Sequence, residues 1–136
     1  MKIEFTIMGE PFGKQRPKHS KYSTYTPDET VQHEQLIQLA YKKIYRDFIF
    51  PKGTYISLTV VAYYGIPKNT SQKKRKLMND KVIRPTKRPD WDNIGKLVSD
   101  ALNKVAYYDD AQVTDALVKK YYSDIPRVEI IIKDSN

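Results

Sequence analysis

The chain has 136 residues, of which 40% are hydrophobic and 29% are charged, a composition typical of a globular protein with a single core. Its formal net charge is +8, which attracts polyanions, most commonly nucleic acid, and its lack of cysteine excludes disulfides, thiolate zinc sites and cysteine nucleophiles. The N-terminus has no apolar run of the signal-peptide kind, and no segment has the apolar length of a membrane span. We therefore expect one cytoplasmic domain, residues 1–136, with no membrane partner.

Hydrophobic periodicity predicts a strand at the N-terminus, followed by a basic loop. Ile3, Phe5 and Ile7 alternate with polar neighbours, as in a half-buried strand. The loop over residues 9–25 combines glycine, proline, basic residues and tyrosines. Its basic and aromatic side chains can contact phosphate and stack on bases, or can simply cover the core.

A helix is predicted next, beginning at a strong start signal. Thr26 is the expected N-cap, Pro27 fits the first helical position, and Glu29 can complete a capping box. His33 lies on this helix, and we assign it no chemistry. One face of the helix is predicted to pack on the core, because hydrophobic residues recur at helical spacing: Leu36, Ile37, Ala40, Tyr41, Ile44 and Phe48.

The middle of the chain predicts a central strand and then a strongly basic segment. Residues 55–64 are β-branched and aromatic, as in a central strand, and this strand could pair antiparallel with the first, in a register that the sequence does not fix. The basic segment, defined as residues 67–89, carries nine basic residues and a single acidic one. It includes a short helix that Ser71 can cap and that runs through Met78, with few apolar residues to hold it. Such a segment is either a solvated face or a flank that binds phosphate.

The C-terminal part predicts an amphipathic helix over residues 93–103 and two strands, 111–122 and 127–133. A turn at Pro126 is expected to join these strands in a β-hairpin. The order of elements predicts an α+β domain with a mixed or antiparallel sheet of about four strands and two main helices.

Aspartates concentrate around that amphipathic helix. If Asp90-Trp-Asp92 is extended, its two carboxylates project to the same side, and Asp92 is also the expected N-cap of the helix. Lys96 lies one turn further on, and a chain that doubles back can return Asp109 or Asp110 to the same place. Clustered carboxylates need a neutralising cation, and all-oxygen ligands suit Mg²⁺, with Mn²⁺ as a substitute.

The metal in such a site would polarise a phosphoryl oxygen and lower the pKa of an attacking water, while Lys96 would stabilise the developing charge. Each residue also has a simpler alternative: Asp92 as a helix cap, Lys96 with Asp100 as a surface pair, and Asp109 with Asp110 as a turn. The joint occurrence of these residues beside the basic segment favours a metal–phosphate site. Spacing alone does not name the substrate.

The same residues resemble a known family, the RusA family of Holliday-junction resolvases. The match rests on three segments, Arg88-Pro-Asp-Trp-Asp-Asn-Ile-Gly-Lys96, Ser99-Asp-Ala-Leu-Asn103 and Tyr108-Asp-Asp-Ala-Gln-Val113. The segments Gly13-Lys-Gln-Arg-Pro-Lys18 and Tyr25-Thr-Pro27 resemble the N-terminal pattern of the family, so the resemblance extends over nearly the whole chain.

The resemblance implies a RusA-like fold and a small homodimeric endonuclease, of a kind often encoded by phages and prophages, that resolves four-way DNA junctions with Mg²⁺. It implies that Asp90, Asp92 and Asp110 are the metal ligands and that Lys96 is the catalytic lysine. Asp109 is the weaker candidate of its pair. A dimer matches the two-fold symmetry of a junction, since two nicks need two active sites.

Trp91 and Gly95 depart from the expected pattern, since a smaller aliphatic residue is expected at position 91 and glycine lowers helix propensity. Neither departure changes a charged position. The residues predicted to contact DNA phosphates are basic and lie in the loop and the basic segment: Lys14, Arg16, Lys73, Lys74, Arg75 and Lys76. Two alternatives remain, a nuclease for flaps or plain duplex and a nucleic-acid-binding protein without catalysis.

Overall fold

The structure, a computed structural model, describes residues 1–25 and 27–134. Its main element is a four-stranded sheet with the strand order β1-β6-β4-β5. Pairing in this sheet is antiparallel between β1 and β6 and between β6 and β4, and parallel between β4 and β5. The strands run over Lys2–Met8 (β1), Ile56–Gly65 (β4), Val113–Ser123 (β5) and Arg127–Asp134 (β6).

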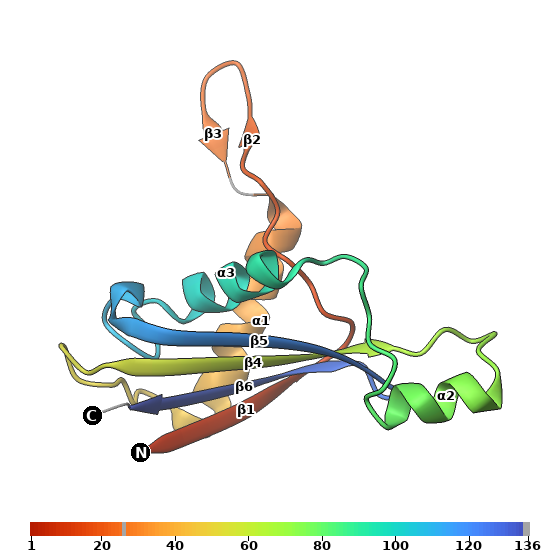
Figure 1. The fold of residues 1–136 in the computed structure, drawn as a ribbon. Coiled ribbons are helices and arrows are strands. Elements are labelled where there is room, and N and C mark those ends of the chain that lie inside the picture. The colour runs from red at the N-terminus through yellow and green to blue at the C-terminus, as the bar shows by residue number, and fades with distance from the viewer. Residues whose placement is uncertain (26, 135–136) are drawn as a thin grey trace.

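The helices α1 and α3 cover one face of this sheet (Figure 1). The helix α2 lies beyond one end of the sheet, near the end of β5, and the β2–β3 hairpin projects away from the body (Figure 1). The bounds are Asp28–Tyr45 (α1), Gln72–Asn79 (α2), Trp91–Leu102 (α3), Lys18–His19 (β2), Thr24–Tyr25 (β3) and Asp110–Gln112 (the 3₁₀ helix η1).

The core lies between the sheet on one side and the helices α1 and α3 on the other. The apolar stripe predicted for the second long helix is confirmed, because Ile94, Leu97, Val98 and Ala101 are all buried. From α1, Tyr41 is fully buried and donates its hydroxyl hydrogen to the carbonyl of Phe48. The α+β class, the four-stranded mixed sheet and the two main helices are thus confirmed.

The predicted C-terminal hairpin is wrong, because β4 lies between β5 and β6. β4 is the most buried strand and takes a central place, while β5, none of whose residues is fully buried, forms an edge. The link between β5 and β6 also lacks an Asn-Gly type of turn, the local signal that favours a hairpin. The first strand does not pair with β4 either, because β6 and β5 occupy both edges of β4. It pairs with β6, with Phe5 opposite Ile130.

The predicted helix boundaries hold approximately. Pro27 occupies the N-cap of α1 instead of its first helical position, and the predicted N-cap Thr26 lies outside the described residues. Leu36 and Ile44 are exposed instead of buried, and Phe48 follows the end of α1. The short helix in the basic segment is confirmed, with Ser71 accepting a hydrogen bond from the backbone N–H of Lys74. In the described part of the chain, no helix is long and apolar enough to cross a membrane.

Candidate active site

The start of α3 differs from the prediction. The helix begins at Trp91, so Asp90 is its N-cap and Asp92 lies in its first turn, and neither carboxylate caps the helix through a hydrogen bond. The extended geometry considered for residues 90–92 is present only at Asp90, because Trp91 and Asp92 are helical. Residues four apart lie on the same face of a helix. Because Asp92 is within the helix, it shares a face with Lys96.

Three of the four predicted catalytic side chains line one cavity, which we call the site cavity. α3 contributes Asp92 and Lys96, and the 3₁₀ helix after it contributes Asp110. The cavity has a volume of about 280 Å³, and its other lining residues come from α3, β4 and β5: Leu58, Val60, Trp91, Gly95, Ser99, Val113, Ala116, Leu117 and Val118. The predicted return of the chain after the helix is thus present.

Hydrogen bonds fix the position of η1 after the end of α3. The backbone N–H of Asp110 donates to the Asn103 side chain at 3.1 Å, which ties η1 to the end of α3. Asp109 accepts a hydrogen bond from the backbone N–H of Ala111 at 2.9 Å and forms a capping box with Gln112. Asp109 therefore builds the turn, while Asp110 faces the site cavity.

The electrostatic surroundings of Asp110 oppose its negative charge. Burial, the hydrogen bond with Asp109 and the charges of Asp109 and Asp100 all raise the pKa of Asp110. The pKa of Asp109 is lowered by its backbone hydrogen bond to Ala111 and by the hydrogen bond with Asp110. A cation bound between Asp92 and Asp110 would offset the repulsion at Asp110.

The donor set of the site cavity fits a hard divalent cation. Mg²⁺ is usually held by one or two carboxylates together with water and substrate phosphate, and Asp92 and Asp110 supply two carboxylates. Among residues 1–25 and 27–134, no three His, Cys, Asp or Glu side chains form a group that could hold a metal ion. That Asp90 shares an ion with the other two stays a prediction.

Asp90 is positioned by a neighbour that the sequence did not identify. The buried Tyr64, on β4, donates its hydroxyl hydrogen to the carbonyl oxygen of Pro89 at 2.6 Å and so fixes the residue directly before Asp90. Burial, and then the charges of Asp90 and Glu10, raise the pKa of Tyr64, so the hydroxyl stays protonated and keeps donating. A tyrosine within an apolar strand gives no sequence signal for this role.

The basic N-terminal loop packs against the start of α3. The backbone N–H of Lys14 donates to the carbonyl of Asn93 at 2.8 Å. Gly13 makes this approach possible, because a Cβ there would lie 2.9 Å from the Cβ of Pro89 and 3.0 Å from that of Asn93. The glycine of the family-like pattern is therefore required by close packing at the candidate site.

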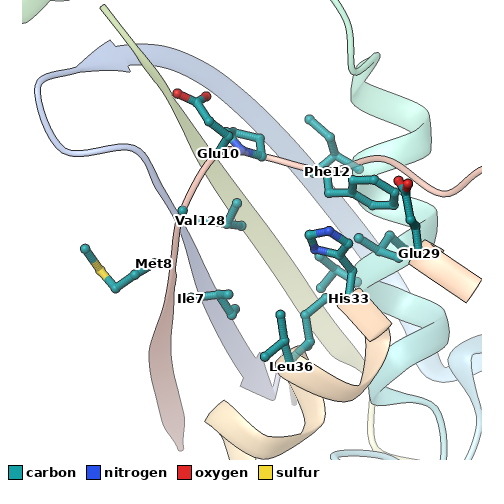
Figure 2. Close-up of a pocket in the computed structure, with 14 residues that line it drawn as sticks. Ile7, Met8, Glu10, Phe12, Glu29, His33, Leu36 and Val128 are labelled. Atoms are coloured by element: carbon teal, nitrogen blue, oxygen red, sulfur yellow. The ribbon is translucent and has the colours of Figure 1, made fainter. Parts of the chain in front are cut away.

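The same loop is anchored to α1 through an aromatic stack (Figure 2). The rings of Phe12 and His33 lie 3.8 Å apart and 7° from parallel, at one side of a second cavity of about 370 Å³. Burial lowers the pKa of His33 despite the opposing charge of Glu29, which favours the neutral ring. His33 therefore has a packing role in holding the loop on α1.

Lys14, predicted to contact DNA, has two carboxylate partners within the protein. Its Nζ lies 2.6 Å from Asp100 and 3.7 Å from Glu34, and we call these three residues the ion cluster. Only 19% of the Lys14 side chain is exposed. Asp100, for which the sequence offered a surface pair with Lys96 as one alternative, instead joins α3 to the N-terminal loop through Lys14. A phosphate contact by Lys14 stays a prediction.

The other predicted DNA contacts lie on exposed surface or in surface ion pairs. Within the described ranges, the ammonium groups of Lys73 and Lys74 on α2 are exposed and have no ion-pair partner. Arg75 lies 2.6 Å from Asp124, and Lys76 lies 2.8 Å from Asp80. Arg16 is exposed in the N-terminal loop.

The rest of the basic segment is attached to the edge strand β5, although few apolar residues hold it. The Nε–H of Arg84 donates to the carbonyl of Lys120 at 2.9 Å, and the Lys120 ammonium donates to the carbonyl of Lys87 at 2.7 Å. The Arg84 guanidinium also lies 4.4 Å from the centre of the Tyr121 ring. The run Lys119-Lys-Tyr-Tyr122 on β5 was the available sequence signal for these contacts.

Comparisons with known proteins identify the family of this chain. A family profile described as "Endodeoxyribonuclease RusA" matches residues 8–133, which include every residue of the candidate site. The chain is also 37% identical to the uncharacterized protein YqaN of Bacillus subtilis (strain 168), over 97% of this chain and 96% of that protein. With its motif residues gathered at one cavity and a family match over nearly its full length, this chain belongs to the RusA endodeoxyribonuclease family.

Proposed function

We propose that this protein is a Mg²⁺-dependent endonuclease that resolves four-way DNA junctions by paired, symmetric nicks during recombination and repair. The observation that carries the proposal is the convergence of Asp92, Lys96 and Asp110 on one cavity, in a chain of the RusA family. A DNA substrate agrees with the net charge of +8 and with a location in the cytoplasm.

In the proposed mechanism, Asp92 and Asp110 would hold the cation at the site cavity, and Asp90 would join them from the N-cap of α3. Mg²⁺, for which Mn²⁺ is expected to substitute, would supply an activated water and stabilise the leaving 3′-oxygen. Lys96 is exposed one turn beyond Asp92, where its ammonium can stabilise charge that builds on the phosphate.

The proposal includes a homodimer, because two symmetric nicks require two sites related by the symmetry of the junction. Exposed apolar side chains on α1, including Leu36, Leu39 and Ile44, are compatible with burial against a second copy. Sedimentation velocity on the purified protein measures the oligomeric state directly, and a monomer on junction DNA would contradict this part of the proposal.

The test of the function is a cleavage assay on a synthetic four-way junction, a flap and a linear duplex, with and without Mg²⁺. We expect paired nicks in the junction only when the metal is present. Asp90→Asn is expected to keep junction binding and lose cleavage, whereas Asp47→Asn, which removes an exposed carboxylate outside the site, is expected to behave as wild type. Wild-type nicking by Asp90→Asn, or preferential cutting of flaps or duplex, would contradict the proposal.

The exposed lysines of α2 give a separate prediction about binding. Replacing Lys73 and Lys74 together by alanine should weaken binding to every DNA probe and lower the slope of log K against log salt by roughly 1.8, since each phosphate contact contributes about 0.9. Binding is measured by fluorescence anisotropy over a range of salt concentrations. The matched control replaces Lys42 and Lys43, an exposed pair on α1, and should leave the slope unchanged. Equal slopes for both double variants would remove α2 from the DNA-binding surface.

A further inference from the structure

Trp91 is an exposed aromatic residue in the middle of the candidate site. It is the first residue of α3, between Asp90 and Asp92, and it is 66% exposed. The side chain is not an isolated surface hydrophobe, because Trp91 also lines the site cavity together with Asp92 and Lys96. Binding a phosphate requires cations and hydrogen-bond donors, so phosphate binding does not account for a large aromatic ring at this place.

The wall of the site cavity opposite α3 is apolar. β4 contributes Leu58 and Val60, and β5 contributes Ala116 and Val118. Gly95 adds no side chain to the helix side, where a Cβ would lie 3.4 Å from Val118. The volume of about 280 Å³ is near the lower end of small-ligand sites, roughly 300–1,000 Å³, which suits one ring system and not a length of strand.

Positive charge lies along the strand that forms this wall. The hydrogen bonds from Arg84 to Lys120 and from Lys120 to Lys87 hold the basic segment along β5. Lys87 and Arg88 are exposed directly before Asp90 in the chain. Cationic groups beside an aromatic ring and an apolar hollow are the combination that binds single-stranded nucleic acid, since the backbone follows the cations and a base stacks on the ring.

We infer that the site cavity receives an unstacked nucleobase of the DNA strand next to the phosphate to be cut, with the Trp91 indole as its stacking partner. The inference rests on the proposed function in taking DNA as the substrate, and it deepens that function by naming the structural element that is recognised. A base that has left the helical stack is available at a branch point but must be pulled out of a continuous duplex at a cost of a few kcal/mol. The cavity would therefore favour branched over linear DNA at the cutting step.

The chain allows a direct test, because Trp91 is its only tryptophan. Excitation at the long-wavelength edge, where tyrosine does not absorb, makes the emission report on that ring alone. The probes are a 15-nucleotide oligothymidylate and a strand of the same length with abasic sugars, both without divalent metal. The two strands carry the same number of phosphates, but only the oligothymidylate has bases that can stack on Trp91. We expect the oligothymidylate to quench Trp91 at saturation and the abasic strand to leave its emission unchanged, with saturation followed by anisotropy of an end label.

Two variants separate stacking from general stability. Trp91→Ala should weaken binding of oligothymidylate by roughly 5- to 150-fold, the range for loss of one stacked base, while Trp91→Phe should retain most of the affinity. Both variants should bind the abasic strand as the wild type does. On four-way junctions in Mg²⁺, Trp91→Ala is expected to cut more slowly than Trp91→Phe.

Equal quenching by the two strands, or unchanged binding of oligothymidylate by Trp91→Ala, would overturn the inference. So would a shift of Trp91 emission with protein concentration in the absence of DNA, because that result assigns the ring to a contact between two copies of the chain. If the stacking results hold and four-way junctions stay intact in Mg²⁺, the inference stands and the proposed junction cleavage fails. The two failures are therefore distinguishable.

Discussion

Replacing Asp110 by asparagine is expected to reduce cleavage of a four-way junction by on the order of 100-fold or more. The change removes one of the two carboxylates that line the site cavity while keeping the size of the side chain. Metal-based stabilisation of phosphoryl transfer is worth several kcal/mol, and each 1.4 kcal/mol is about tenfold in rate. The measurement is the single-turnover cleavage rate in Mg²⁺ with enzyme in excess.

The stability of Asp110→Asn should not fall with its activity. Burial and neighbouring carboxylates raise the pKa of Asp110, so its charged form is held at a cost that asparagine does not have. Urea unfolding without metal is expected to give a midpoint equal to or above that of the wild type. A large loss of stability would mean that the fall in activity reports unfolding instead of a missing ligand.

Asp109→Asn is the matched control for this experiment. The residue is adjacent to Asp110 and carries the same charge, yet its carboxylate caps η1 through the backbone N–H of Ala111. Asparagine can accept the same hydrogen bond, so the turn and the activity should both be kept. A greater loss from Asp109→Asn than from Asp110→Asn would reverse the assignment of the two residues.

Lys14→Met is expected to destabilise the fold by about 1–3 kcal/mol, the cost of leaving charged hydrogen-bonding groups without their partner. In the ion cluster, the Lys14 ammonium lies between Asp100 on α3 and Glu34 on α1, and all three side chains are less than 30% exposed. Without it, two carboxylates would remain close together in partly dehydrated surroundings. The free energy of unfolding is measured by urea titration at neutral pH.

The pH dependence of this contribution follows from the pKa of Lys14. Burial opposes its charged form, but the hydrogen bond and charge of Asp100, together with Glu34, outweigh burial and raise the pKa of Lys14. A raised pKa in the folded state means that the stabilisation is fully present below the unfolded value, about 10.5. It is lost as the pH rises through the folded value, so wild type and Lys14→Met should converge in strongly alkaline solution.

Two further variants decide between a structural role and a DNA contact for Lys14. Arg16→Met changes a nearby exposed cation and should weaken DNA binding without changing stability. The double variant Lys14→Met with Asp100→Asn should recover part of the lost stability, because it also removes one unpaired carboxylate. If Lys14→Met weakened DNA binding at unchanged stability, the ion cluster would have no structural importance and the DNA contact would be supported.

The predictions from sequence succeeded where local patterns carry the information. The stripe of Ile94, Leu97, Val98 and Ala101 has a helical period that any packing of α3 must bury. The cap at Ser71 depends on the three residues that follow it, so it too was predictable. The start of α3 was misplaced by two residues, because Asp90 and Asp92 are equally good N-caps and no local signal distinguishes them.

The predictions failed where the outcome depends on competition between distant segments. The hairpin was predicted only from the short link between β5 and β6, but the strongly buried β4 lies between these two strands in the sheet. The sequence likewise offered Lys14 as a free cation, because its partner Asp100 lies 86 residues away along the chain.

The residue types that give this protein its chemistry can therefore be identified from local sequence, whereas their arrangement in space cannot. The aspartates, the lysine and the basic segment are properties of the sequence, and they sufficed to indicate a metal–phosphate site. Tertiary structure alone directs Asp110 and not Asp109 into the site cavity and uses Gly13 to seat the loop on α3. It also places Trp91 beside the apolar wall formed by β4 and β5. These features depend on contacts between residues far apart in the chain, whose energies are decided only when the whole core packs.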